Sequence, residues 1–436
     1  MIDPLTISLL ALAGMAVLIL LHVPIGPAMG LAGFLAFWAM SGFGPAVSLF
    51  GTETATAFSN LELAVIPLFL LMGGFASAAG LSGDLYRLAY AVVGHRRGGL
   101  AASTILACAG FGAVCGSSVA TAATMSEIAL PEMRKRGYAP TIASGSVAAG
   151  GTLGILIPPS IIMVIYAFLT EQSVITMYVA AIIPGLIAVL FHLVAIAIWV
   201  RVDPVSAPAG PKVRWQERWT VVRQSWAVIS LAVAVSGGLY AGIFTATEAA
   251  AVGAAMAFLF TLMRRHLTKR VFLQCLIQSA STTGLIYMII VGANVFSYFF
   301  TVSGLPEAFV TWVGHLDIPP LAVIFILLVI YVILGAIFDE NAALLLTLPL
   351  VFPLITGLGY SPIWWGVVMV MVIEIGMIAP PIGLNVFVVH SIARDIPMRT
   401  IYWGIMPLLV ADFARLALLT VFPALTLWLP QTLGMR

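Results

Sequence analysis

The residues that could do chemistry form two short polar clusters inside long apolar stretches. The first is Gly116-Ser117-Ser118, with Thr121 one turn later, which offers hydroxyls beside a flexible glycine. The second is Asp339-Glu340-Asn341, which offers carboxylates and an amide. A hard cation that loses its water inside a bilayer needs several oxygen ligands of this kind. The clusters are therefore candidate cation sites.

A proline pair follows each cluster, in the pattern Gly-x-x-x-Pro-Pro at 154–159 and at 376–381. Proline lacks the backbone N–H and interrupts a helix, so nearby carbonyls are left free to act as ligands. The carbonyls of 154–160 can complete the first site, and those of 376–385 the second. The candidate cation or substrate contacts are Gly116, Ser117, Ser118, Thr121, Gly154, Pro158, Asp339, Asn341, Gly376, Pro380 and Asn385.

Each cluster also has a simpler explanation. Gly-Ser-Ser is a common turn, and small residues allow membrane helices to pack closely. Asp339 and Glu340 could lie at a turn near the outer surface, whereas acidic groups at membrane depth are costly and usually functional. Both explanations stay open for these residues.

Four more charged residues stand inside apolar stretches. Glu248 and Glu374 suit either a proton or cation site or a structural hydrogen bond to a neighbouring helix. Asp412 and Arg415 stand three apart, so they share one helical face, and a local ion pair is favoured over an Arg415 contact with an anionic substrate. The histidines show neither i, i+4 spacing nor nearby carboxylates, so no metal site is assigned to them. No ATP-binding Gly-Lys-Ser/Thr motif is present, and neither an enzymatic activity nor a resident cofactor is expected.

The two clusters belong to a duplicated sequence. One offset of 222 positions superposes Pro131 on Pro353, Tyr138 on Tyr360, and both proline pairs on each other. Apolar segments that are broken at corresponding places in two halves of a chain indicate the binding site of a transporter. The chain is therefore interpreted as a transporter with an internal repeat.

Composition places this duplicated chain in a membrane. It is 62% hydrophobic and 8% charged, whereas a soluble domain is about 25% charged. Its few basic residues lie in short clusters between apolar segments, which excludes a nucleic-acid partner. Eight stretches are long and apolar enough to span a bilayer: 5–23, 28–44, 63–80, 174–200, 225–243, 248–263, 277–301 and 401–425.

The remaining apolar stretches complete two similar repeats. In the first repeat, 1–201, the stretch 98–135 is expected to be a re-entrant helical hairpin and 140–170 a broken helix. In the second repeat, 224–436, the hairpin is 319–356 and the broken helix 361–392. The stretch 202–223 is a linker between them.

The positions of the basic residues predict the orientation. Nearly all of the 19 Lys and Arg residues fall in 81–97, 133–138, 201–224, 264–274 and 393–400. The opposite loops, 45–62, 171–173, 302–318 and 357–360, contain none. Since basic loops stay in the cytoplasm, both termini are expected in the periplasm and the two hairpins open to opposite sides. The predicted fold is an all-α polytopic membrane protein with two inverted-topology repeats.

The run 116–121, continuing through 135–138 to 151–160, closely resembles the large membrane subunit of tripartite ATP-independent periplasmic (TRAP) transporters. The segment 376–385 is similar to the second-half motif of that family. The resemblance covers essentially the whole chain, and a stretch such as 145–160 is far more specific than a short motif.

This resemblance implies sodium-driven uptake of an organic acid, such as a dicarboxylate, across the bacterial inner membrane. It implies two protein partners, a periplasmic substrate-binding protein and a separate small four-helix membrane subunit, in contact with membrane lipids. It also implies an elevator motion of the hairpins and broken helices against the other helices, with Na⁺ as the coupling ion. Glu340 and Asn341 stand where the family often has a small hydroxyl residue, so the ligands of the second site depart from the family pattern.

Two other functions remain as alternatives. One is a stand-alone, cation-coupled carrier of organic anions. The other is a proton-conducting or non-transporting membrane subunit, which predicts relays of Lys, Glu and His along several helices. This chain has almost no Lys outside its loops, which disfavours the second alternative.

Overall fold

The computed structural model describes residues 3–212 and 214–435, and within these ranges it contains helices and turns but no strand. The first half comprises α1 (Pro4–Leu20), α2 (Ile25–Ser41), α3 (Phe43–Ser59), η1 (Leu61–Ala64), α4 (Val65–Ala78), α5 (Leu81–Val93), α6 (Gly99–Cys115), α7 (Ser118–Lys135), α8 (Pro140–Leu156), α9 (Ile161–Leu169) and α10 (Val174–Val202). The short α11 (Trp215–Gln224) follows. The second half comprises α12 (Trp226–Ala232), η2 (Val233–Gly237), α13 (Gly238–Tyr240), α14 (Ala246–Met263), α15 (Lys269–Ser303), α16 (Leu305–Gly314), α17 (Pro320–Ile337), α18 (Glu340–Gly357), α19 (Pro362–Gly376), α20 (Leu384–Ile392), α21 (Met398–Val421) and α22 (Ala424–Thr432).

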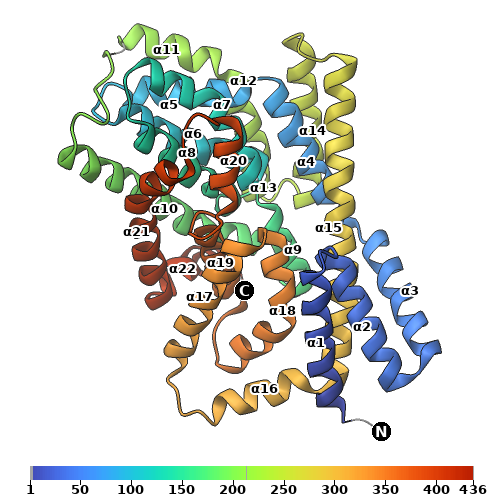
Figure 1. Cartoon of the computed structure of the whole chain (residues 1–436). Helices are drawn as coiled ribbons and strands as arrows, with labels where there is room; N and C mark the ends of the chain where they lie inside the picture. Colours follow the sequence, from blue (N-terminus) through green and yellow to red (C-terminus); the bar gives the residue numbers. More distant parts are fainter. Residues whose placement is uncertain (1–2, 213, 436) are drawn as a thin grey trace.

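The two halves repeat each other in three dimensions. Moved by 222 positions, α7 takes the bounds 340–357, which are those of α18, and α8 begins where α19 begins. The hairpin α6–α7 lies near α5 and α11, whereas the hairpin α17–α18 lies at the opposite end beside α16 (Figure 1). The prediction of two inverted repeats, each with a hairpin and a broken helix, is confirmed.

The chain forms two groups of helices. Figure 1 shows α1–α4, α14 and α15 along one side, and the hairpins and broken helices along the other. Within the first group α2 packs closely on α15, because a Cβ added at Gly26 or Gly33 would come within 2.8 Å of the α15 backbone. Small residues of this kind let membrane helices approach closely where no hydrophobic effect drives association.

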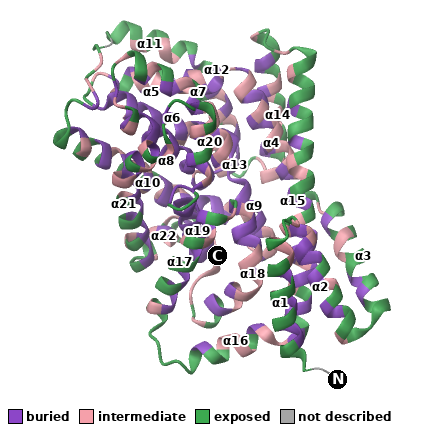
Figure 2. Ribbon diagram, viewed as in Figure 1, coloured by how far each residue is buried: buried purple, intermediate pink, exposed green. Residues whose placement is uncertain are grey.

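The first halves of the two broken helices form the centre of the other group. Every residue of α8 from Ile142 onward is buried, and so is every residue of α19 after its first proline. Figure 2 shows this burial in contrast to the exposed outer faces of α1, α3 and α15. A helix that is apolar on all sides and fully covered by protein can place a few polar atoms out of contact with lipid.

Four helices occupy segments that the sequence analysis assigned to loops or to the linker. These helices are α3, which overlaps 45–62, α5 within 81–97, α11 within 201–224 and α16 within 302–318. The loop assignments for these segments are wrong. The sequence analysis missed the helices because they are too short or too polar to be identified as membrane spans. In α3, for instance, Thr52, Glu53, Thr54 and Thr56 lower the hydropathy although the segment is helical.

Eight helices of the described chain are long and apolar enough to cross a membrane, or nine if the bent pair α11 and α12–α13 forms one span. The basic segments gather at one end of the molecule. The Gly98 and Ala139 amides donate to carbonyls at Ala207 and Ser206, 3.1 and 2.8 Å away, and Arg134 pairs with Asp395 at 2.7 Å. Residues in or directly next to four of the segments expected on the cytoplasmic side are thus in contact.

Candidate functional site

The first hairpin turns at Gly116, whose φ of +64° is a left-handed conformation that glycine adopts without strain. Ser117 then caps α7, since its hydroxyl accepts a hydrogen bond from the Ala120 amide at 3.4 Å. A Cβ at Gly116 would lie 3.2 Å from the carbonyl oxygen of Pro159. The turn of the hairpin therefore lies directly against the break between α8 and α9, as the sequence predicts for its first cluster.

Gly154 makes this contact possible. A Cβ added there would come within 2.6 Å of the Thr121 hydroxyl and 2.8 Å of the Ser117 carbonyl oxygen. The Thr121 hydroxyl itself donates to that carbonyl at 2.7 Å. The end of α8 and the start of α7 are thus in backbone contact. Pro158 follows in the buried loop and precedes Pro159 through a cis peptide bond.

The second hairpin repeats this arrangement with different side chains. Asp339 caps α18, accepting a hydrogen bond from the Ala342 amide at 3.2 Å. A Cβ at Gly376 would lie 2.6 Å from the Gly335 backbone, so this hairpin also rests against its broken helix. Pro380, again in a cis Pro-Pro pair, is exposed, so the second break is more open than the first.

The two hairpin tips meet each other. The Ser118 hydroxyl donates to a carboxylate oxygen of Glu340 at 3.2 Å and lies 3.5 Å from the sulfur of Met377. Ser118 is fully buried and Glu340 is 9% exposed. Asp339, in contrast, is exposed. Glu340 belongs to the second cluster predicted from the sequence but was not among the individual contacts selected there, although the offset of 222 places it at the position equivalent to Ser118.

Several buried oxygens near the breaks form no hydrogen bond with any described residue. They are the hydroxyl of Ser160 and the side-chain carbonyl oxygens of Asn341 and Asn385. The Asn385 amide group donates to the Ala148 carbonyl at 3.4 Å, which fixes the side chain against α8. Buried polar atoms are nearly always hydrogen-bonded, so these free acceptors are suited to a ligand.

A cavity of about 250 Å³ lies between the second tip and the group of helices formed by α1–α4, α14 and α15. Asp339, Asn341 and Ala342 line one wall, and the start of α2 and the middle of α15 line the other. The predicted residues of the second tip thus face a space between the two helix groups.

A network of fully buried ionic groups lies next to the second break. Arg415 donates to Asp412 at 2.8 Å and pairs with Glu374 at 3.1 Å, while His192 lies 2.8 Å from the same Asp412 oxygen. The local Asp412–Arg415 pair predicted from their spacing is confirmed. The expectation that no histidine has a carboxylate neighbour is wrong for His192, because its partner stands 220 positions away. Among the described residues, no group of three or more metal-ligating side chains is present.

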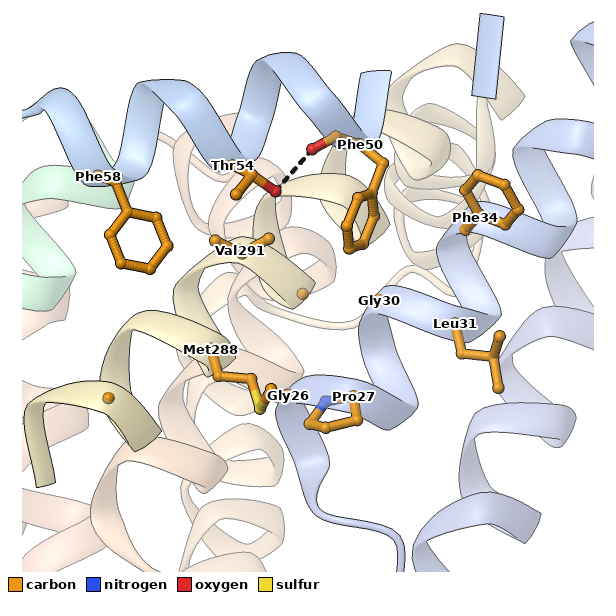
Figure 3. A pocket seen from close by; sticks show the side chains of 12 residues that line it. Gly26, Pro27, Gly30, Leu31, Phe34, Phe50, Thr54, Phe58, Met288 and Val291 are labelled. Carbon is orange, nitrogen blue, oxygen red and sulfur yellow. Dashed lines mark hydrogen bonds between the residues drawn. The ribbon is translucent and has the colours of Figure 1, made fainter. Parts of the chain in front are cut away.

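An apolar groove lies elsewhere, between α2, α3 and α15 (Figure 3). It measures about 650 Å³, and glycine and aromatic or aliphatic side chains such as Phe34, Phe58 and Met288 line it. Its one polar side chain, Thr54, donates its hydroxyl to the Phe50 carbonyl at 2.7 Å. A surface with so few polar groups cannot orient a carboxylate.

Residues 12–425 match the family model described as the tripartite ATP-independent periplasmic transporter, DctM component. The chain belongs to this family. It is a subunit of a TRAP-type transporter, and it is not an enzyme.

Known relatives cover nearly the whole chain. The chain is 37% identical to the C4-dicarboxylate TRAP transporter large permease protein DctM of Pseudomonas aeruginosa, over 89% of this chain and 90% of that one. It is 31% identical to the sialic acid TRAP transporter large permease protein SiaM of Vibrio cholerae, over 85% and 87%. The crystal structure of the Alcanivorax borkumensis YdaH transporter shares the fold, with a TM-score of 0.62, 16% identity and coverage of 88% and 89%.

Proposed function

We propose that this chain is the sodium-coupled large permease of a system that takes up a C4-dicarboxylate or similar organic acid. In this proposal it acts with a small four-helix membrane subunit and a periplasmic binding protein in the bacterial inner membrane. The relatives support this substrate class, because the 37%-identical one is named for C4-dicarboxylates.

The observation that carries the cation site is the buried contact between Ser118 and Glu340. No described basic side chain lies within 4.0 Å of the Glu340 carboxylate. A buried carboxylate without a positive partner is costly, and a bound cation removes that cost. The hydroxyls of Ser117, Ser118 and Ser160 and the free carbonyls of the breaks supply the additional oxygens that Na⁺ requires.

An elevator motion is the proposed mechanism. The hairpins and broken helices of the two repeats are joined by bonds such as those from Asn385 to Ala148 and from Tyr166 to Pro362, at 3.4 and 2.7 Å. These bonds favour movement of that group as one body. The cavity beside Asp339 and Asn341 lies at its boundary with α2 and α15, which is where sliding would occur. In this scheme 1–201 and 224–436 are the repeats and 202–223 is the linker.

The proposed orientation places both termini in the periplasm and the basic end in the cytoplasm. Its support is that α11, which carries two arginines, and α16, which carries no basic residue, lie at opposite ends (Figure 1). Single cysteines at Arg218 and Glu307 should react with an impermeant thiol reagent from opposite sides. All three native cysteines are buried, so the background is low. Labelling of both positions from the same side would refute this orientation.

The transport proposal is tested by reconstitution. With the small subunit, the binding protein and an inward sodium gradient, proteoliposomes should accumulate labelled succinate, and replacing sodium by potassium should abolish the uptake. Robust uptake by this chain alone would instead favour a stand-alone carrier. Uptake that persists without sodium would refute the coupling.

A further inference from the structure

A polar cavity lies away from the hairpin tips, at the basic end of the molecule. It measures about 380 Å³ and is enclosed by α5 and by the outer ends of α6 and α7. Tyr86, Arg87 and Tyr90 of α5 line it together with Glu132 of α7 and Arg136 just beyond. None of these side chains belongs to the candidate transport site.

The side chains around this cavity hold their polar groups in fixed positions. Arg136 donates to the Tyr90 hydroxyl at 2.8 Å, and its guanidinium carbon lies 4.8 Å from the centre of the Tyr90 ring. Arg87 pairs with the buried Asp84, which Arg264 also contacts. Both arginines are therefore oriented, and each keeps N–H groups that these partners do not use.

The cavity has more donors than acceptors. The Tyr90 hydroxyl accepts from Arg136, so its own proton remains available. The buried Tyr86 hydroxyl has no hydrogen-bond partner among the described residues. Glu132 is the one acidic side chain in the lining, and Lys135 at 3.3 Å and Arg136 at 4.0 Å already face it. Such a set fits a ligand that carries negative charge and several acceptor oxygens.

The surroundings indicate which ligand brings those oxygens. Near the cavity, Arg96 and Arg97 are exposed in the turn between α5 and α6, and Arg134 and Lys135 are exposed at the end of α7. Arginine and tyrosine gather where membrane helices reach the headgroup region, and basic pockets between helices bind lipid phosphates there. We propose that this cavity binds the phosphate of an anionic phospholipid or, by the same chemistry, a soluble phosphate anion. The inference rests on the membrane fold and is independent of sodium coupling.

Native mass spectrometry of the delipidated full chain tests the proposal. Phosphatidylglycerol should bind at least about tenfold more tightly than phosphatidylcholine with the same acyl chains, since the latter carries no net charge. Arg136→Gln should weaken phosphatidylglycerol binding by about 10- to 100-fold, and Tyr86→Phe by about 3- to 10-fold. The control Arg394→Gln changes an exposed arginine that does not line the cavity and should bind like the unmodified chain.

Two further arms distinguish the source of the phosphate. If inorganic phosphate displaces the lipid at low millimolar concentration and Arg136→Gln weakens phosphate binding, the proposed phosphate site is confirmed and its natural ligand is a soluble anion. If phosphate does not displace the lipid, the lipid is the ligand. Equal binding of the two lipids, or no effect of Arg136→Gln in a variant that elutes and melts normally, would overturn the proposal. Displacement by succinate but not by phosphate would overturn it as well.

Discussion

Replacing Ser118 by alanine should weaken sodium binding strongly. The substitution removes a buried hydroxyl that donates to the Glu340 carboxylate at 3.2 Å. A hydrogen bond to a charged group contributes about 1.5–3 kcal/mol, and a carboxylate left without its donor costs a similar amount. Since about 1.4 kcal/mol of binding free energy corresponds to a tenfold change in affinity, the half-saturating sodium concentration for uptake should rise about 10- to 150-fold.

The assay is succinate uptake by the complete reconstituted system as a function of sodium concentration. Ser103→Ala is the matched control, because Ser103 is equally buried but donates to the Gly99 carbonyl of its own helix. This variant should change the half-saturating sodium concentration less than about twofold. The bond it removes joins a side chain to the carbonyl one turn earlier in the same helix, and such a bond contributes little to the structure around it. Glu340→Gln completes a double-mutant cycle with Ser118→Ala, and the pair should be coupled by more than about 0.5 kcal/mol.

Two outcomes would refute this reasoning. If Ser118→Ala transports with unchanged sodium dependence, the first tip is only a turn that allows close helix packing, which is the simpler explanation given above for Gly-Ser-Ser. If Ser118→Ala and Glu340→Gln each raise the sodium requirement but their effects add, the two residues act separately and the contact between the tips is not part of the site.

Two further predictions concern packing around the breaks. Arg415→Met removes the ionic partner of the buried Glu374 and one of the two partners of Asp412, so the free energy of unfolding should fall by about 3–5 kcal/mol. In thermal melts the exposed Arg399→Met should be nearly neutral, and an equal effect of both would argue against the network. Gly154→Ala places a methyl group 2.6 Å from the Thr121 hydroxyl and should abolish uptake, whereas Gly14→Ala meets nothing within 4 Å and should not. Normal uptake by Gly154→Ala would contradict the close contact.

The sequence predicts the part of the fold that positions the site. Proline pairs and small polar turns are local signals, so the hairpins and breaks can be placed from the residues alone. In the structure α6 and α7 cover Gly99–Lys135, within one residue of the expected hairpin at 98–135. The repeat adds a second copy of every signal, which is why α17–α20 could be placed as well.

The features that the sequence analysis did not predict depend mostly on contacts between segments that are distant in the sequence. The partner of His192 is Asp412, and no spacing rule connects positions 220 residues apart. The helices α3, α5 and α16 are amphipathic or polar, so the length and hydropathy that identify spans do not detect them. Glu340 is a different case, because applying the offset to single residues as well as to motifs would have paired it with Ser118.

The contact between Ser118 and Glu340 also bears on the history of the chain. Equivalent residues of two inverted copies can touch only where the local two-fold axis passes between them. In an ancestral dimer of identical halves, the residue at this position would have faced its own copy. Two glutamates there would repel each other, whereas two serines would not. In a single chain the two copies can differ at this position, so one carboxylate can stand at the axis from one side only, as Glu340 does opposite Ser118.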